Sequence, residues 1–207
     1  MQFYGQRPPI AAEYAKYPVP IKHIDPLTGA EAAAAYALLK DADNIADYGE
    51  RDKAYPSAIC FYGAPFLADC AAAVKRHIRP YLDYEIVETY WYARLYGMGD
   101  KLDIHVDRGA CFISVSICFG YDFNTLFPDG SAWPIGALAQ DGDGAEREVL
   151  FALKPGEGML YPGCSAPHWR DVFLGEHCGQ AFFHYVPAAA DTFGAYFSDS
   201  ERGKTAS

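Results

Sequence analysis

The pattern of apolar and polar positions changes once along the chain. Up to about residue 84 the apolar residues recur at helical spacing or lie in irregular stretches. From Glu85 onwards they form short runs rich in β-branched and aromatic residues, which are typical of strands. Two helices followed by many short strands favour an α+β chain that is mainly β, a sandwich or barrel with the helices packed on one side.

Two helices are expected in the first part of the chain. Thr28 and Glu31 have the spacing of a capping box, and the Ala-rich run after them predicts a helix that ends at Lys40. A second helix is predicted from Pro65 to Pro80, where a proline ends it. Its apolar residues share one face: Phe66, Leu67, Cys70, Val74 and Ile78. Prolines interrupt residues 1–27, which we expect to form an extended arm, and residues 45–64 look irregular.

The second part of the chain predicts a series of strands separated by Gly and Pro. The expected strands are 90–96, 102–107, 111–119, 148–153, 158–161 and 180–186. Residues 120–147 form a long loop, and loops of this length usually carry function or are disordered. We expect one domain over residues 1–207, made of the arm (1–27), a helical part (28–84), a strand-rich core (85–186) and a loose tail (187–207).

Charge and composition exclude several kinds of partner. The formal net charge is −10 and no basic patch is visible, so a nucleic-acid partner is not expected. No stretch approaches the roughly 20 apolar residues that span a bilayer, so no membrane association is expected either. The N-terminus lacks the apolar segment of an export signal, and the six cysteines show no C-x-x-C spacing. A cytoplasmic protein with reduced thiols is the expectation.

The candidate chemistry begins with His105 and Asp107, which are separated by one β-branched residue. On a strand the two side chains point to the same side. One further histidine would complete two imidazoles and one carboxylate, a set that leaves positions open and suits non-haem Fe(II). His168 is the favoured third ligand, because it follows a Pro-Gly turn and strand. His177 and His184 are the alternatives, and His184 in the last strand is either core or an orienting residue.

These residues stand in a longer order of motifs. Tyr96, Gly99 and Leu102 precede the His-x-Asp pair, and Leu153-x-Pro155-Gly156-x-Gly158 precedes His168. Over about residues 60–186 this order resembles the Fe(II)- and 2-oxoglutarate-dependent dioxygenases, especially their prolyl-4-hydroxylase-like branch. Three segments further resemble a bacterial and phage set of small 2-oxoglutarate oxygenases, namely Trp133-Pro134-Ile135, His168-Trp169-Arg170 and Phe182-Phe183-His184-Tyr185-Val186.

The resemblance implies a double-stranded β-helix (jelly roll) that binds Fe(II), 2-oxoglutarate and O2. It further implies a hydroxylase that acts on an unactivated C–H bond of a small molecule, amino acid or peptide. Family halogenases replace the metal-binding carboxylate, so an intact Asp107 argues for hydroxylation or a related oxidation. The aromatic residues Trp91 and Trp169 are expected to line the substrate entrance.

The chain departs from the family at the co-substrate. In the prolyl-hydroxylase-like branch a Lys or Arg about ten residues beyond the distal histidine binds the far carboxylate of 2-oxoglutarate. Here Gln180 stands at that place and brings no charge. We expect Arg170, or in second place Arg94, to supply the cation, with Tyr96 adding a hydrogen bond.

Three other functions fit parts of this pattern. An iron enzyme of the same fold that does not use 2-oxoglutarate would explain Gln180. A cupin-like binding or sensor protein would hold a metal without turnover. A jelly roll without a metal is the third. The sequence leaves the substrate and the oligomeric state open.

Overall fold

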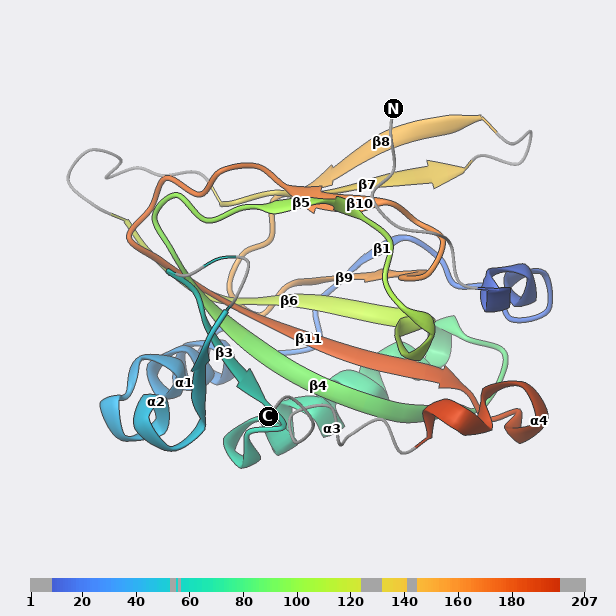
Figure 1. Ribbon diagram of the computed structural model, residues 1–207, viewed down its shortest axis with the longest axis horizontal. Coiled ribbons are helices and arrows are strands. Elements are labelled where there is room, and N and C mark those ends of the chain that lie inside the picture. The colour runs from blue at the N-terminus through green and yellow to red at the C-terminus, as the bar shows by residue number, and fades with distance from the viewer. Residues whose placement is uncertain (1–8, 53–54, 56, 124–131, 141–144, 198–207) are drawn as a thin grey trace.

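The computed structural model describes residues 9–52, 55, 57–123, 132–140 and 145–197. Two antiparallel sheets face each other, and the helices α1 to α3 lie against the outer side of the larger sheet (Figure 1). This arrangement confirms the predicted fold class, a mainly-β α+β chain with a double-stranded β-helix and helices on one side.

The order of strands in each sheet differs from their order in the chain. The larger sheet runs β1 (Lys22–Ile24), β9 (Gly158–Tyr161), β6 (Ile113–Asp122), β11 (His177–Pro187), β4 (Ile86–Gly97), β3 (Ile59–Tyr62) and β2 (Gly49–Arg51). The smaller sheet runs β5 (Leu102–His105), β10 (His168–Arg170), β7 (Ile135–Gln140) and β8 (Glu146–Phe151). Several neighbours, such as β9 and β6 or β5 and β10, therefore come from distant parts of the chain, and β5 and β8 are the edges of the smaller sheet.

Both predicted helices are present. The helix α1 (Gly29–Lys40) begins with a capping box, in which the Thr28 side chain accepts from Glu31 N and the Glu31 carboxylate accepts from Thr28 N. The second helix begins with a 3-10 turn (Pro65–Leu67) and continues as α3 (Ala68–Ile78). A further helix, α2 (Ala42–Tyr48), follows α1 directly and is capped by Asp41.

Alternation along the strands of the larger sheet separates the core from the site. On β6, Ile113, Val115 and Ile117 belong to the core beneath the helices, where each buried side chain contributes about 1.5–3 kcal/mol. The residues between them include Ser114 and Ser116, whose side chains turn to the smaller sheet. On this strand hydrogen-bonding groups therefore face the space between the sheets, while the opposite face is covered by the helices.

The structure corrects the expected 120–147 loop. Within the part of it that the structure describes, β7 and the start of β8 form a hairpin of the smaller sheet, while 124–131 and 141–144 lie outside the described residues. The sequence of β7 is rich in Ala and Gly, which have low strand propensity, so its pairing with β8 and β10 determines its structure. Gly136 is required there, because a Cβ at this position would lie 2.4 Å from the Trp169 ring.

The arm, the irregular stretch and the tail are more ordered than predicted. The arm contains a 3-10 helix (Pro9–Ala15) and β1, and residues 45–64 contain the end of α2 as well as β2 and β3. The tail begins with α4 (Ala190–Phe193) and a 3-10 turn (Gly194–Tyr196), and Phe193 is buried against Phe112. Residues 1–8 and 198–207 lie outside the described residues.

Two global expectations can be compared with the structure. Among the described residues, no helix has the length and apolar character that crossing a bilayer requires. All six cysteines are free thiols, and five of them are buried.

Candidate metal centre

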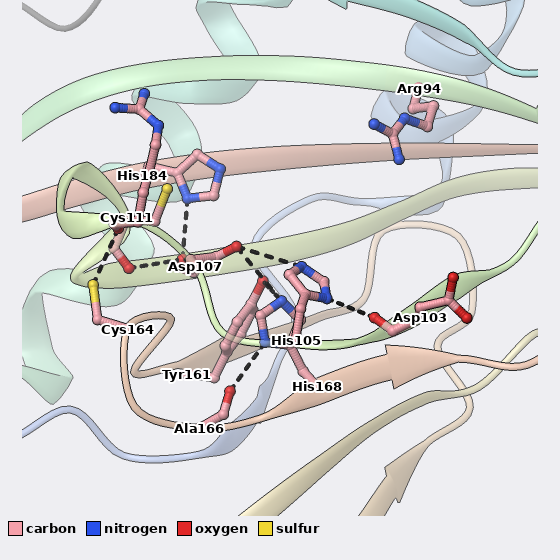
Figure 2. A network of polar contacts seen from close by, with 12 residues as sticks. Arg94, Asp103, His105, Asp107, Cys111, Tyr161, Cys164, Ala166, His168 and His184 are labelled. Carbon is pink, nitrogen blue, oxygen red and sulfur yellow. Dashed lines mark hydrogen bonds and ion pairs between the residues drawn. The ribbon is translucent and has the colours of Figure 1, made fainter. Parts of the chain in front are cut away.

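His105, Asp107 and His168 lie together between the two sheets (Figure 2). His105 ends β5 and His168 begins β10, and the two histidines are register partners across this strand pair. Asp107 Oδ1 lies 3.6 Å from His105 Nε2 and 3.7 Å from His168 Nε2. Two imidazole nitrogens and one carboxylate oxygen therefore converge on one point, although the expected strand 102–107 ends at His105 and Asp107 lies just beyond it.

Main-chain hydrogen bonds orient both imidazoles. His105 Nδ1 lies 2.7 Å from the carbonyl oxygen of Asp103, and His168 Nδ1 lies 3.0 Å from that of Ala166. A carbonyl only accepts, so each Nδ1 carries the proton and each Nε2 presents a lone pair to the shared point. This is the tautomer that a metal ligand needs, fixed by outer hydrogen bonds before any metal binds.

The electrostatics keep Asp107 ionised and His168 neutral, while they favour the protonated form of His105. Burial raises the pKa of Asp107, but the charge of His168 and the hydrogen bond with His105 outweigh it, so the pKa lies well below its usual range. Burial lowers the pKa of His168 to about 4 despite the nearby Asp107 charge. For His105 burial acts downward, but the Asp107 hydrogen bond and charge raise the pKa overall. One ionised carboxylate therefore faces at least one neutral, buried imidazole.

We expect the metal-free protein to lose stability in acid partly through His168. Between its ordinary pKa of 6.5 and its folded pKa of about 4, the unfolded chain binds more protons at this residue, so unfolding becomes easier as the pH falls. Because one pKa unit corresponds to about 1.4 kcal/mol, this amounts to at most about 3 kcal/mol. His105, with its raised pKa, acts above pH 6.5 and in the opposite sense.

Urea unfolding of the metal-free wild type and of His168→Gln, followed from about pH 7 to about pH 4, measures this contribution. The free energy of unfolding should fall less steeply in the variant, because glutamine does not titrate. Equal slopes would contradict a buried, neutral His168.

The alternative ligands lie elsewhere. His177 is at the start of β11, partly exposed, with Nδ1 3.7 Å from Asp122 Oδ2 at the surface. His184 is buried next to the site, with Nδ1 3.0 Å from Ser114 Oγ. It forms a second possible ligand group with Asp107 and Cys111, but the three residues of the predicted set are the ones whose nitrogens face Asp107 Oδ1.

Arg170 is buried deep between the sheets. Its guanidinium donates to Trp133 O (2.7 Å), Ser116 Oγ (3.2 Å) and Gln180 Oε1 (3.0 Å). Among the described residues it forms no ion pair, and its Nε has no hydrogen-bond partner. A buried guanidinium without a carboxylate is costly, so its surroundings suit an anionic ligand.

Arg94 has a different environment. Its NH2 group lies 2.6 Å from Asp52 Oδ2 in a buried ion pair, and its NH1 group donates to the Tyr96 hydroxyl at 3.0 Å. Burial raises the pKa of Tyr96, while the charges of Arg94 and Arg170 act against this rise. Arg94 is therefore already neutralised, and Arg170 is not.

The side chains of the two tryptophans expected at the substrate entrance face away from the space between the sheets. Trp91 packs against the core beneath the helices, because it alternates with Tyr90 and Tyr92 on β4. The Trp169 ring covers Gly136 on the outer face of the smaller sheet, since its neighbours His168 and Arg170 point inward. Tyr92 and Phe182, stacked with ring centroids 4.7 Å apart, take the inward positions instead.

One further contact supports the site, and no pattern in the sequence predicted it. The Tyr14 hydroxyl, from the N-terminal arm, donates to Phe112 O at 2.6 Å and accepts from Cys164 N at 3.1 Å. These two partners belong to the segments that follow Asp107 and precede His168. Only the folded structure brings Tyr14 to them, across sequence separations of 98 and 150 residues.

Comparison with known proteins supports the fold. No family model and no curated protein matches the sequence. Solved structures do resemble it: a prolyl-4-hydroxylase from Pseudomonas putida is 13% identical, with a TM-score of 0.56 over 87% of this chain and 98% of that chain. HygX from Streptomyces hygroscopicus, solved with nickel and 2-oxoglutarate, is 10% identical, with a TM-score of 0.59 over 86% of each chain.

A third similar structure is the non-haem α-ketoglutarate-dependent epimerase SnoN from nogalamycin biosynthesis. It is 14% identical, with a TM-score of 0.57 over 86% of this chain and 82% of that chain. The chain therefore has the fold of the 2-oxoglutarate and Fe(II) oxygenases, prolyl-4-hydroxylases among them. At these identities the likeness concerns the fold, and structures of this fold carry out more than one reaction.

Proposed function

We propose that the protein is an Fe(II)- and 2-oxoglutarate-dependent oxygenase that hydroxylates a small molecule, amino acid or peptide. The observation that carries this proposal is the combination of an oriented His105, Asp107 and His168 set with a buried, acid-free Arg170 two residues further along β10. The first suits a non-haem iron, and the second suits the far carboxylate of a dicarboxylic co-substrate.

The three ligand residues would hold Fe(II). Neutral imidazole nitrogens and an ionised carboxylate suit this ion, and three protein ligands leave positions open for other molecules. When bound, iron supplies the oxidative chemistry, in which 2-oxoglutarate and O2 give succinate and CO2 while a C–H bond of the substrate is oxidised. The protein supplies the tautomers, the charge and the shielding from water.

The co-substrate would lie between the metal ligands and Arg170. Gln180 stands at the position where the family resemblance implies a cation, and its side-chain oxygen accepts a hydrogen bond from Arg170 at 3.0 Å. A guanidinium from β10 thus reaches the place for which the resemblance implies a cation from β11. Tyr96 and Ser116 add hydroxyls near this end, so a carboxylate there would meet a charge and several donors.

Arg94 would serve the co-substrate only indirectly. Its charge is balanced by Asp52, and its hydrogen bond to Tyr96 positions that hydroxyl. This arrangement favours Arg170 as the anchoring cation. It also answers the main argument for an enzyme that does not use 2-oxoglutarate, because that argument rested on Gln180 alone.

Binding and turnover test the proposal separately. Calorimetry with Mn(II)-loaded protein should detect 2-oxoglutarate, and should detect 2-oxobutyrate, which lacks the far carboxylate, more weakly. Iron, 2-oxoglutarate and a panel of amino acids and peptides should give succinate in step with O2 consumption. The product should be heavier by one oxygen atom, whereas an epimerised product would keep its mass.

Failure to bind 2-oxoglutarate would favour the iron enzyme that uses another co-substrate. Binding without O2 consumption across the panel would favour the sensor protein. The net charge of −10 makes nucleic acids the least promising addition to that panel.

A further inference from the structure

A buried chain of polar groups connects Asp107 to the last strand of the larger sheet. Asp107 Oδ2, the oxygen turned away from the histidines, lies 3.0 Å from Ser114 Oγ on β6. The same hydroxyl lies 3.0 Å from His184 Nδ1 on β11. Ser114 and His184 are 0% and 2% exposed, so water cannot substitute for either contact.

The direction of these hydrogen bonds follows from counting protons. Ser114 has one hydroxyl proton and three possible acceptors: Asp107 Oδ2 at 3.0 Å, Cys111 O at 3.1 Å and an unprotonated His184 Nδ1 at 3.0 Å. The ionised carboxylate is the strongest acceptor, and without the proton its oxygen would face the serine lone pairs. Ser114 therefore donates to Asp107, and His184 must donate to Ser114 through a protonated Nδ1.

The surroundings leave Asp107 little freedom. Its main-chain N–H donates to Gly163 O at 2.8 Å. A Cβ at Gly163 would lie 2.3 Å from Ser114 Oγ and 2.6 Å from Asp107 Oδ2, so the glycine backbone closes directly over the carboxylate. His184 is held in turn by the Tyr90 ring, with centroids 4.6 Å apart.

We propose that Ser114 and His184 are positioning residues that keep Asp107 Oδ2 away from the metal, so that only Oδ1 binds. This inference rests on the proposed function, because the coordination position that Asp107 Oδ2 would otherwise occupy is one that 2-oxoglutarate or O2 needs. A carboxylate without this restraint can turn both oxygens to a cation and occupy two positions. The need to keep metal positions open would then explain why a buried Ser–His pair lies behind the carboxylate.

The test compares Ser114→Ala with Thr89→Val, the removal of another buried hydroxyl. Thr89 Oγ1 donates only to the main-chain oxygens of Ala110 and His184, at 2.8 and 3.1 Å. In Mn(II)-loaded Ser114→Ala we expect 2-oxoglutarate affinity to fall about tenfold or more, because the freed Asp107 Oδ2 competes for a position that the co-substrate needs. Metal affinity should fall less, because the freed carboxylate keeps or increases its contacts. Thr89→Val should lose stability but keep the affinity for both ligands.

The absorption spectrum of the Co(II)-loaded protein provides a second readout that needs no co-substrate. We expect a changed d–d spectrum in Ser114→Ala and an unchanged one in Thr89→Val, because only the first alters how many oxygens reach the metal. His184→Asn retains a donor near the Nδ1 position and should resemble wild type. His184→Phe removes the donor and should resemble Ser114→Ala.

The outcomes distinguish this inference from the proposed function. A wild type that binds no 2-oxoglutarate would overturn the proposed function, while the cobalt spectra would still report on Asp107. If Ser114→Ala has the spectrum and the 2-oxoglutarate affinity of Thr89→Val, the positioning role is wrong. If Ser114→Ala does not fold, the two His184 variants decide, and identical spectra for Asn and Phe would overturn the inference.

Discussion

Replacing His168 by alanine is expected to abolish turnover and to leave the protein without bound iron. Two ligands would remain, and because loss of an outer-shell partner alone costs 10- to 100-fold in affinity, loss of a ligand should cost more than about 100-fold. The fold should persist, since the main core lies on the other side of the larger sheet, beneath the helices. Metal content after dialysis, succinate formation and circular dichroism measure the three effects.

His105→Ala should behave in the same way, because its Nε2 is equivalent to that of His168 with respect to Asp107. His177→Ala is the matched control: a histidine of the neighbouring sheet that pairs with Asp122 at the surface. It should keep metal and activity. Full activity in His168→Ala would remove this residue from the ligand set and make His184 the next candidate.

The second large effect is expected at the co-substrate. Arg170→Ala should weaken 2-oxoglutarate binding, because truncation of one partner of a buried charge pair costs about 2–5 kcal/mol. At about 1.4 kcal/mol per tenfold, this corresponds to a loss of about thirty- to several-thousand-fold. Metal affinity should hardly change. Arg170→Lys should fall between, because it keeps the charge but loses the planar fork that contacts Trp133, Ser116 and Gln180.

Arg94→Ala, measured side by side, should give the opposite pattern. It leaves Asp52 buried without its cation, and breaking a buried pair costs about 3–5 kcal/mol of stability. The affinity for 2-oxoglutarate should fall less than in Arg170→Ala. Reversed results would exchange the two roles, and intact binding in both variants would contradict a cation anchor for the co-substrate.

Local rules predicted much of this molecule. The capping box at Thr28 and the strand at residues 158–161 are present as expected, and the side chains of His105 and Asp107 meet although the strand ends at His105. Asp107 and His168 could both be predicted as metal ligands although they are far apart in the chain, because Asp107 lies in a His-x-Asp motif and His168 follows a Pro-Gly turn and strand. Patterns that depend on neighbours in the sequence were therefore reliable.

Features that depend on long-range pairing were missed. The strand β7 has a composition that does not favour strands, and it is one because β8 and β10 lie beside it. The outward orientation of Trp91 and Trp169 depends on which face of each sheet is covered, which no local pattern reveals. Ser114 stands out in the sequence as a polar residue among β-branched neighbours, but the sequence does not reveal that its hydrogen-bond partner is Asp107.

The contact of Tyr14 with Phe112 and Cys164 has a consequence for how the metal centre is maintained. The Tyr14 hydroxyl hydrogen-bonds to the segment after Asp107 and to the segment before His168. Tyr14 lies in the 3-10 helix Pro9–Ala15, outside both sheets, so this helix helps to set the spacing of the ligand residues. Chain ends usually tolerate change well, since few contacts hold them. The segment around Tyr14 is held by such contacts, and an insertion or deletion there would act at a distance on the spacing of the metal ligands.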